Sequence, residues 1–491
     1  MLAEALGAPA LDLDRCIEQR AGCSVASFWA EHGEMAFRAL EEKELTLRLA
    51  ADEPHVIALG GGTLLSKPLR HRLLAEHKIL GLHAPLTTLI SRIGDAADRP
   101  LLQGDSLARL EAMLEARGEA YAEVHARIGT DGMLEQVVPR LLAAAEAADM
   151  MMPLGSRSHP IQLSDGGLEH QLAAWSKQAN ARIGLWLVDE GAYSAHAHRF
   201  DALAARSGAA LHRVAGGERN KTLSSVQHLW TVFASAKIDR SQHVAIAGGG
   251  VVSDLCAFAA STWHRGTPHL IVPTTLLGMA DASVGGKTAI DTESGKNLVG
   301  TTWQPRAVFV DTSFLLSVPA DAWRADQAEL AKVAALRDAS LFSALRSDVV
   351  PGARELRRAL RVKVDLVSAD EHDQRERALL NFGHTVGHAL EVSSGYALRH
   401  GVAVAEGMRL ETEALVRLGL SHPSALEALA TELGRLGLGR AEWPGGSGGF
   451  TDAILADKKM AAGSLRLTGL SALGHASLVH VPAMTFVDAL R

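Results

Sequence analysis

The residues best suited to chemistry are two histidines in the segment Asn381-Phe-Gly-His384-Thr-Val-Gly-His388. Side chains four positions apart share one face of a helix, so His384 and His388 are spaced as two metal ligands or as a ligand and an acid/base group. His400 could return from the next helix, and Glu329 could add an anionic ligand. In a chain with 22 histidines, such a pair alone is more typical of structural histidines, so its context decides.

A glycine-rich turn supplies part of that context. Ala247-Gly-Gly-Gly250 follows an apolar run and precedes a helical pattern that includes Asp254. Bare glycine amides and a helix N-terminus can approach a pyrophosphate. The turn does not match GxGxxG, so an ordinary strand-to-helix turn stays open. Gly285-Gly-Lys287-Thr288 is not a P-loop, because Asp281 stands where the first glycine of GxxxxGK[ST] is required.

Basic residues stand singly among Gly, Asn, Asp and His residues in these motifs, which suggests that they converge on one anion. They are Lys221, Arg265, Lys287, Lys296, Lys332, Lys363, Arg377, and Lys458 or Lys459. We therefore expect a substrate that carries phosphate or carboxylate.

Composition limits the class of protein. The 491 residues are 47% apolar, enough for two or three domains. Residues 1–150 hold 23 acidic and 15 basic residues, net −8, whereas the rest are near neutral at +1. This balance gives no electrostatic signal for nucleic-acid binding. Three cysteines without a framework spacing favour a reducing compartment. With no continuous apolar run of about 20 residues, we expect a soluble cytoplasmic protein that engages neither membranes nor nucleic acids.

Apolar runs alternate with helical segments from about residue 185 to 310, which predicts a doubly wound parallel sheet with ligands beyond the strand C-termini. Residues 320–440 read as mostly helical, and Arg466–Val481 alternates like a hairpin. A stretch without periodicity near Met150–Ser158 marks a boundary.

Taken in order, the motifs resemble one family, 3-dehydroquinate synthase, over residues 160–485. The matching motifs are Gly217-Glu-Arg-Asn-Lys221, Gly248-Gly-Gly-Val-Val-Ser-Asp254, Arg265-Gly266, Pro273-Thr-Thr-Leu-Leu277, Asp281-Ala-Ser-Val-Gly-Gly-Lys287, Gly295-Lys-Asn297, Ala328-Glu-Leu-Ala-Lys332, Asp370-Glu371, Arg377-Ala-Leu-Leu-Asn381-Phe-Gly-His384 and Asp457-Lys-Lys459.

The resemblance implies conversion of the sugar acid phosphate DAHP into 3-dehydroquinate with loss of phosphate, using NAD and a divalent metal, zinc or cobalt. Its metal ligands would be Glu329, His384 and His400, with His388 as a proton-transfer or supporting residue. The other residues implied in catalysis are Lys287, Lys332, Arg377, Asn381 and Asp281, and those implied in substrate binding are Arg265, Lys296, Asn297, Lys363 and Lys458.

NAD would contact a further set of residues by the same resemblance. They are Asp189, Glu218, Lys221, Gly248, Gly249, Gly250, Val251, Val252, Ser253, Asp254, Thr274, Thr275, Phe314, Leu315, Leu316 and Ser317.

Residues 1–131 resemble shikimate kinase lacking its beginning. The matching motifs are Leu11-Asp-Leu-Asp14, Gly33–Glu41, Val56–Gly62, Arg99-Pro-Leu-Leu102 and Arg117-Gly-Glu-Ala-Tyr121. The resemblance places Asp14, Arg38, Gly60, Gly61, Gly62 and Arg117 at shikimate, Arg99 over ATP and Asp12 near magnesium. Because the phosphate-binding loop should precede Asp12 by about 20 residues and eleven are present, we expect no kinase turnover, with ATP and magnesium used only if the true N-terminus is longer. A non-catalytic scaffold stays open for this part.

We therefore expect an α/β protein with three domains: a kinase-like α/β domain without its P-loop at residues 1–150, a linker at 151–159, a Rossmann-like NAD domain at 160–320 and a mainly α-helical metal and substrate domain at 321–491. The alternatives for residues 160–491 are another sugar-phosphate cyclase or a metal-dependent polyol dehydrogenase. The family resemblance also implies a homodimer.

Overall fold

The computed structural model describes residues 1–50, 53–93, 106–131, 133–147, 150–293, 295–395, 397–438, 448–455, 460–461 and 463–491. Arg99, Lys458 and Lys459 lie outside these ranges. The chain divides into an N-terminal unit, Met1–Pro160, and a C-terminal unit, Ile161–Arg491. Within the described ranges, no helix combines the length and apolar character needed to cross a membrane.

The N-terminal unit is an α/β arrangement, as expected. Two parallel strand pairs, β1 with β2 and β3 with β4, are joined by helices. Leu13, Ile17, Phe37 and Leu45 form its largest apolar core with residues of α4. Its elements are α1 (Leu2–Ala5), β1 (Ala10–Asp12), α2 (Leu13–Ala21), α3 (Val25–Leu49), β2 (Val56–Ala58), η1 (Thr63–Leu65), α4 (Lys67–Glu76), β3 (Leu80–His83), α5 (Leu86–Ile93), α6 (Ser106–Ala116), α7 (Gly118–Ala122), β4 (Ala126–Gly129), α8 (Leu134–Ala147), β5 (Met150–Met152) and η4 (Gly155–Arg157).

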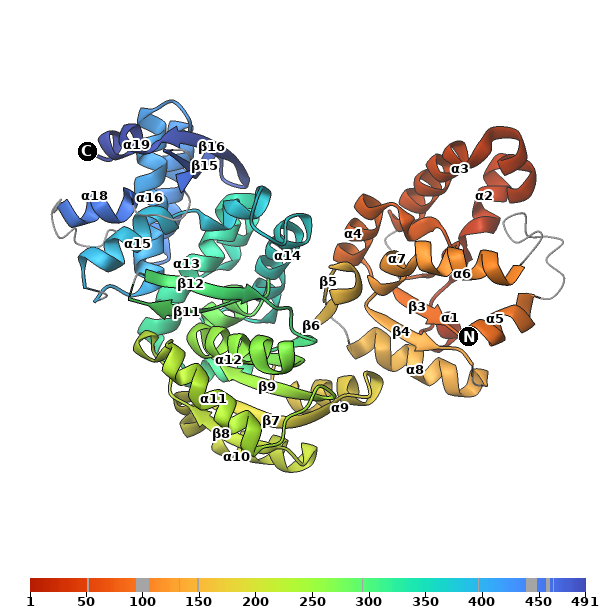
Figure 1. Cartoon of the computed structure of the whole chain (residues 1–491). Coiled ribbons are helices and arrows are strands. Elements are labelled where there is room, and N and C mark those ends of the chain that lie inside the picture. The colour runs from red at the N-terminus through yellow and green to blue at the C-terminus, as the bar shows by residue number, and fades with distance from the viewer. Residues whose placement is uncertain are drawn as a thin grey trace. The chain divides into compact units, whose positions relative to one another are not determined.

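The C-terminal unit begins with the predicted parallel sheet, whose strands run in the order β6-β13-β10-β9-β7-β8 with all neighbours parallel. Near-continuous apolar runs form these strands because helices cover both faces of such a sheet (Figure 1). Its elements are β6 (His159–Ser164), α9 (Leu168–Gln178), β7 (Arg182–Asp189), α10 (Glu190–Ser207), β8 (Ala210–Val214), η5 (Glu218–Asn220), α11 (Leu223–Ser235), β9 (Gln242–Gly248), α12 (Gly250–Thr262), η6 (Trp263–Arg265), β10 (His269–Pro273) and β13 (Ala307–Asp311).

The strand order reverses between β7 and β9. From β7 the chain moves outward to β8 and then returns to the other side of β7 as β9. Ligands of doubly wound sheets bind in the crevice at such a reversal, beyond the strand C-termini. Asp189 and Gly248, which end β7 and β9, therefore border the expected nucleotide crevice.

A mainly helical region follows the sheet, as predicted, and the predicted hairpin is β15 and β16 (Figure 1). A second antiparallel hairpin, β11 with β12, precedes the helical region in the chain and was not expected. The remaining elements are η7 (Gly278–Ala282), β11 (Lys287–Thr292), β12 (Gly295–Thr302), η8 (Thr312–Ser317), α13 (Ala320–Arg337), η9 (Ala339–Ala344), α14 (Ala353–Ala369), η10 (Glu376–Asn381), α15 (His384–Ser393), α16 (His400–Arg417), α17 (Pro423–Arg435), α18 (Gly448–Leu455), β14 (Met460–Ala461), β15 (Ser464–Ala472), β16 (His475–Pro482) and α19 (Ala483–Leu490).

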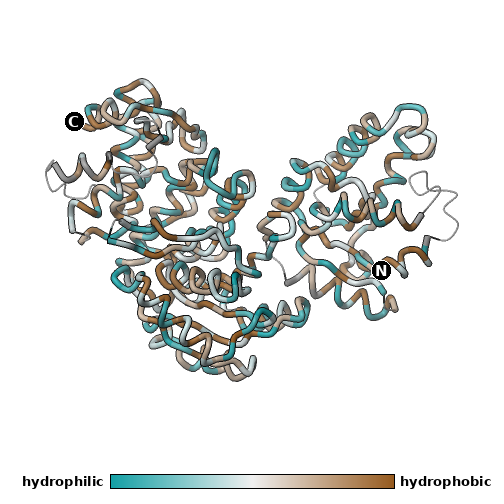
Figure 2. The backbone as a smooth tube through the Cα atoms, in the orientation of Figure 1, coloured by the Kyte–Doolittle hydropathy of each residue, from teal (hydrophilic) through white to brown (hydrophobic). Residues whose placement is uncertain are grey.

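Amphipathic patterning orients these helices. Hydrophobic and hydrophilic residues alternate along them in Figure 2. Apolar side chains of the helices, among them Val386, Leu415 and Phe486, pack with Leu467 of β15 into a second core between α15, α16, the hairpin and α19. Burial of each such side chain contributes about 1.5–3 kcal/mol, so packing of this core rather than helix propensity fixes where the helices lie.

Three helices approach one another closely at glycines. A Cβ on Gly383 would lie 2.5 Å from the Val404 carbonyl of α16, and one on Gly387 would lie 3.0 Å from the Ala403 carbonyl. A Cβ on Gly407 would overlap the Gly383 carbonyl, and one on Gly401 would overlap the Ala325 carbonyl of α13. The backbones of α13, α15 and α16 therefore meet where any larger side chain would separate them.

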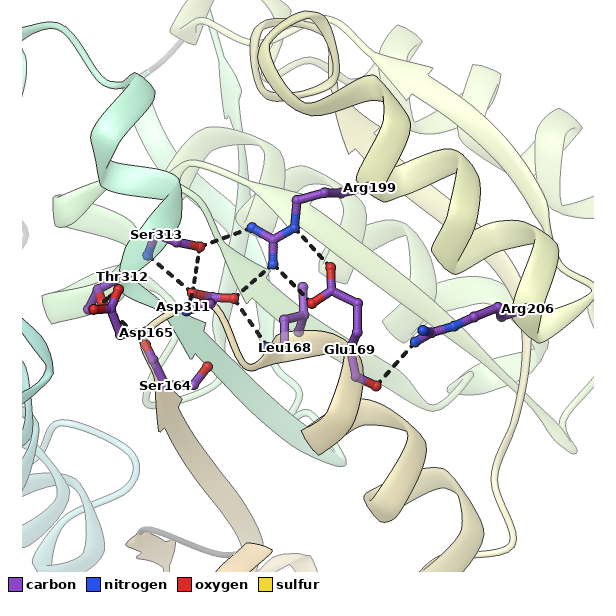
Figure 3. Close-up of polar contacts among 10 residues, drawn as sticks. Ser164, Asp165, Leu168, Glu169, Arg199, Arg206, Asp311, Thr312 and Ser313 are labelled. Atoms are coloured by element: carbon purple, nitrogen blue, oxygen red, sulfur yellow. Dashed lines mark hydrogen bonds and ion pairs between the residues drawn. The ribbon is translucent and has the colours of Figure 1, made fainter.

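An ion-pair network joins Asp311, the last residue of β13, to the helices α9 and α10, as Figure 3 shows. The Arg199 guanidinium of α10 donates to Asp311 Oδ2 (2.9 Å), Glu169 Oε1 (2.8 Å) and Ser313 Oγ (3.0 Å). It also lies 4.5 Å from the centre of the Phe314 ring. The fully buried Asp311 is thereby neutralised, and η8 is held against α10.

Gly407→Ala tests the close helix contact. The added methyl group must push α15 from α16, so we expect a loss of about 1–3 kcal/mol of unfolding free energy, measured by urea unfolding of the full chain. Gly434→Ala is the matched control, because Gly434 stands in α17 with open space around it and should gain up to about 1 kcal/mol. Equal effects of the two substitutions would contradict the packing described.

Candidate functional site

Glu329, His384 and His400 meet at one point, although they come from α13, α15 and α16. Glu329 Oε1 lies 3.6 Å from His384 Nε2 and 3.4 Å from His400 Nε2. One ligand atom from each residue lies within 4.8 Å of the other two. The carboxylate and the two imidazoles therefore face each other across a small gap.

This donor set fits a divalent metal. Two ligand atoms bound tetrahedrally to one zinc at about 2.1 Å lie about 3.4 Å apart, close to the two separations observed here. Glu329 is 2% exposed, and neither of its oxygens accepts a hydrogen bond of good geometry from the described residues. Its one lysine partner, the Lys332 ammonium, forms an ion pair with Oε2. A buried carboxylate with free acceptor capacity beside two imidazoles suits a cation.

His388 lies beside this cluster. Its ring centre is 5.4 Å from that of His384 and 6.2 Å from that of His400, and the residue is exposed. The i, i+4 spacing therefore brings both histidines of the motif to the site. His388 with Glu391 and His400 forms a second, more open group of metal-ligand type.

Glu411 was not expected from the sequence. It is 1% exposed on α16, and its carboxylate accepts from the Gly383 amide (2.9 Å) and the Val386 amide (3.1 Å) at the start of α15. It thus satisfies two of the amides that every helix N-terminus leaves unpaired. Because His384 is the first residue of α15, this cap fixes the backbone that carries a predicted ligand.

Buried cations and a carboxylate lie next to the cluster. Lys332, on α13, is 1% exposed, and Lys363, on α14, is 4% exposed. Lys363 Nζ lies 2.5 Å from Asp281 Oδ1, on the π-helical turn η7. Burial alone would raise the pKa of the Asp281 carboxyl, but the Lys363 and Lys332 cations outweigh it and hold that pKa below its usual range. Three of the predicted residues therefore form one charged wall.

Two other predicted catalytic residues lie on η10, which packs against α13 and α14, and a third lies on β11. Arg377 is buried in η10 and donates to the Gly285 carbonyl (3.1 Å) and the Glu371 carbonyl. Asn381 ends the same turn, three residues before His384. The Lys287 side chain is 55% exposed and pairs with Asp373 (2.6 Å).

The glycine turn lies where a nucleotide crevice is expected. Gly249 precedes α12 without a side-chain cap, so the first amides of this helix are open to an anion. A Cβ on Gly248 would lie 3.0 Å from Asp189 Cβ, and one on Gly249 would lie 3.2 Å from Thr275 Cγ2. Asp189 Oδ1 itself caps α10 by accepting from the Gly191 amide (2.9 Å).

A second polar group borders the same end of the sheet. The buried Lys221 ammonium donates to Asp254 Oδ2 (2.6 Å) and to the Asn297 side chain. Burial raises the pKa of Asp254 to about 6 against the opposing Lys221 cation. Lys296 Nζ lies 3.5 Å from Glu218 Oε1. The structure therefore brings together three of the residues predicted to contact NAD, Lys221, Asp254 and Glu218, with two predicted to contact substrate, Asn297 and Lys296.

The remaining predicted positions differ in accessibility. Phe314 and Leu315 are fully buried, with Phe314 stacked on Phe200, so their side chains belong to the core. Leu316 is 82% exposed, and Ser317 is hydrogen-bonded to His196 (2.8 Å). Arg265 is exposed, with a positive φ of 64°.

The N-terminal unit also gathers most of its predicted site. Arg117 donates to the Gly61 carbonyl (3.0 Å), and a Cβ on Gly62 would overlap the Arg38 guanidinium. A Cβ on Gly60 would lie 3.4 Å from Asp14 Oδ1. Asp12 caps α2 by accepting from the Asp14 amide (3.1 Å).

Two further residues belong to this cluster and were not predicted as site residues from the sequence. Tyr121 donates to the Gly61 carbonyl (2.6 Å), and Glu41 pairs with Arg38 (2.7 Å). The i, i+4 spacing of Tyr121 from Arg117 and the i, i+3 spacing of Glu41 from Arg38 were the available signals.

Glu411→Gln tests the carboxylate cap of α15. An amide offers one acceptor where the carboxylate offers two, so one helix amide loses its partner at a cost of about 1.5–3 kcal/mol. We expect hydrogen exchange of the Gly383 and Val386 amides to speed up at least about tenfold. Glu413→Gln, on the same helix but paired with Arg409 and Arg417, is the control; unchanged exchange at α15 in Glu411→Gln would refute the cap.

Comparisons with known proteins identify the family of this chain. Family models match 3-dehydroquinate synthase N-terminal at residues 211–325, 3-dehydroquinate synthase C-terminal at 326–460 and shikimate kinase at 1–146. The 3-dehydroquinate synthase of Halorhodospira halophila is 37% identical over 334 residues, which are 66% of this chain and 93% of the relative. That of a Synechococcus species is 33% identical over 357 residues, or 69% and 96%.

Solved structures show the same fold. A 2-epi-5-epi-valiolone synthase from Streptomyces hygroscopicus with NAD+ and Zn2+ bound has a TM-score of 0.61 at 26% identity, covering 68% of this chain and 95% of its own. A 2-deoxy-scyllo-inosose synthase has a TM-score of 0.62 at 23% identity, covering 68% and 96%. The chain belongs to the 3-dehydroquinate synthase family and carries a shikimate kinase-like domain at residues 1–146.

Proposed function

We propose that the C-terminal unit converts DAHP into 3-dehydroquinate and phosphate, with bound NAD and one divalent metal, zinc or cobalt. The observation that carries the proposal is the meeting of Glu329, His384 and His400 beside the buried cations of Lys332 and Lys363. The family membership supplies the substrate, and the valiolone synthase structure with NAD+ and Zn2+ supports the two cofactors.

Glu329, His384 and His400 would hold the metal, which polarises a substrate hydroxyl as a Lewis acid when it is bound. The Gly248–Gly250 turn and the α12 N-terminus would hold the NAD pyrophosphate, with Asp189 at the neighbouring strand end. NAD held there would supply a reversible oxidation of a substrate hydroxyl, and the resulting ketone would acidify the adjacent C–H bond so that phosphate could leave by elimination.

The charged wall, together with Arg377 and Glu329 beside it, binds and orients the substrate. Lys332, Lys363 and Arg377 supply three buried cations, whereas Glu329 and Asp281 supply two anions. The excess positive charge is directed at the phosphate and carboxylate of DAHP, in surroundings where water screens little. Holding several polar groups at once keeps the intermediates in place until the ring closes.

Proton movement falls to His388. It is exposed, yet its ring lies next to His384 and His400, so it can exchange protons with solvent and with a substrate held at the cluster. Asp281, paired with Lys363, orients that ammonium toward the substrate.

Another sugar-phosphate cyclase and a metal-dependent polyol dehydrogenase are the competing activities. A dehydrogenase accumulates NADH, whereas the proposed reaction leaves NAD unchanged. Substrate profiling with DAHP and with other sugar phosphates distinguishes 3-dehydroquinate synthase from another sugar-phosphate cyclase.

The proposal also includes a homodimer and domain boundaries near residues 150 and 320.

His384→Ala tests the proposed function. The wild-type chain should release one phosphate per DAHP without net NADH, and chelation should abolish this until zinc is restored. His384→Ala should lower kcat at least about 100-fold even with added zinc, because a ligand is lost. His475→Ala, an exposed histidine at the start of β16, should behave as wild type. Full activity in His384→Ala would remove the ligand assignment, and net NADH would favour the dehydrogenase.

For residues 1–146 we propose recognition of shikimate by Asp14, Arg38, Gly60–Gly62 and Arg117. The proposal is limited to binding. The 491 residues contain no GxxxxGK[ST] sequence, the loop that would hold the phosphates of ATP.

Arg117→Ala tests this second site. Loss of a charged hydrogen-bond donor should weaken shikimate binding about 10–100-fold, measured by isothermal titration calorimetry of the full chain. The exposed Arg109→Ala on α6 removes a similar charge from the same unit and should leave the Kd unchanged. Equal affinity in wild type and Arg117→Ala would contradict the assignment.

A further inference from the structure

The two histidines of the metal cluster are held in the same way. His384 Nδ1 lies 3.1 Å from the Phe382 carbonyl oxygen, and His400 Nδ1 lies 3.3 Å from Glu391 Oε1. In both rings it is the other nitrogen, Nε2, that faces Glu329. Each imidazole is therefore held by a contact to Nδ1, the ring nitrogen that points away from Glu329.

These contacts determine where the ring protons lie. A backbone carbonyl and a carboxylate can only accept a hydrogen bond, so Nδ1 must be the protonated nitrogen in both rings. A neutral imidazole with its proton at Nδ1 has its lone pair at Nε2. Both lone pairs then point at the cation site. For His384 the backbone fixes this tautomer, whereas for His400 a side chain does.

That side chain, Glu391, lies on α15, one turn after His388, and is 8% exposed. Besides His400, the charged or titratable groups acting on it are His388 on its own helix and Lys296 from β12. Burial restricts its rotamers, so the acceptor presented to His400 stays in one place.

Glu391 could instead be a metal ligand, since His388, Glu391 and His400 also form a group of ligand type. The contact made by its carboxylate argues against this. It engages Nδ1 of His400, on the side away from Glu329, while Nε2 of the same ring faces Glu329 at 3.4 Å. One imidazole thus bridges the two carboxylates, with Glu329 on the side of His384.

We propose that Glu391 is a positioning residue, which holds His400 in the tautomer and orientation that bind the metal together with Glu329 and His384. A carboxylate behind a ligating histidine strengthens metal binding, and its removal costs about 10–100-fold in affinity. The inference rests on the metal site of the proposed function and adds a residue outside its ligand set.

The test measures zinc affinity of metal-free full-length protein by competition with a chromophoric chelator, without reference to activity. Glu391→Ala should raise the Kd for zinc about 10–100-fold. Glu391→Gln should recover part of that loss, because its amide oxygen still accepts from His400 Nδ1. Glu413→Gln, a carboxylate on the helix of His400 that pairs with Arg409 and Arg417, should leave the Kd unchanged.

Cobalt absorption spectra separate orientation from ligation. If Glu391 positions His400, saturating Co2+ should give the same visible bands in wild type and Glu391→Ala, since the ligand set is retained. Changed bands would make Glu391 a ligand and overturn the inference, as would an unchanged zinc Kd in Glu391→Ala. If wild type fails to bind zinc, or His384→Ala binds it equally well, the proposed metal site itself is wrong, a result that differs from failure of Glu391 alone.

Discussion

The close approach of three helix backbones is the constraint on which the metal cluster depends. Packed helices usually keep their axes about 8–10 Å apart, at a distance set by the side chains between them. Gly383, Gly387, Gly401 and Gly407 remove those side chains where α15 meets α16 and where α16 meets α13. Each helix can then place one predicted metal ligand at a shared point. These ligands are Glu329 on α13, His384 on α15 and His400 on α16.

The second consequence of this packing is electrostatic. A buried carboxylate is costly unless a cation or hydrogen bonds compensate it. Here Glu329 is compensated by Lys332, Asp281 by Lys363 and Glu411 by two helix amides. The compensation leaves Glu329 with acceptor capacity and leaves the lysines fixed before any substrate arrives. Preorganised charge of this kind does not have to rearrange during the reaction.

Local sequence signals predicted much of this arrangement. Two of these signals are short-range patterns. The i, i+4 spacing of His384 and His388 predicted that both histidines share one helix face. The glycine turn after a buried strand predicted the nucleotide crevice. The strands around Leu187 and Ile246 were predicted from their apolar runs, which a parallel sheet covered on both faces requires.

Other features depend on contacts far apart in the chain. Glu411 accepts from the amide of Gly383, which stands 28 residues before it at the start of α15, and no local pattern distinguishes it from a surface glutamate. The β11–β12 hairpin has an exposed, mixed second strand that lacks clean alternation. The family resemblance predicts that Phe314 contacts NAD, and the structure adds that its ring is buried against Phe200, a contact that the sequence does not indicate. Each needed the tertiary structure to become visible.

Anomalous diffraction at the zinc absorption edge from crystals of the zinc-loaded protein tests the central claim, that the packing of α13, α15 and α16 creates a metal site. The account predicts one strong peak in the C-terminal unit, at about 2.0–2.2 Å from a Glu329 oxygen, His384 Nε2 and His400 Nε2. A peak bound by other residues, or no peak at this cluster, would contradict it.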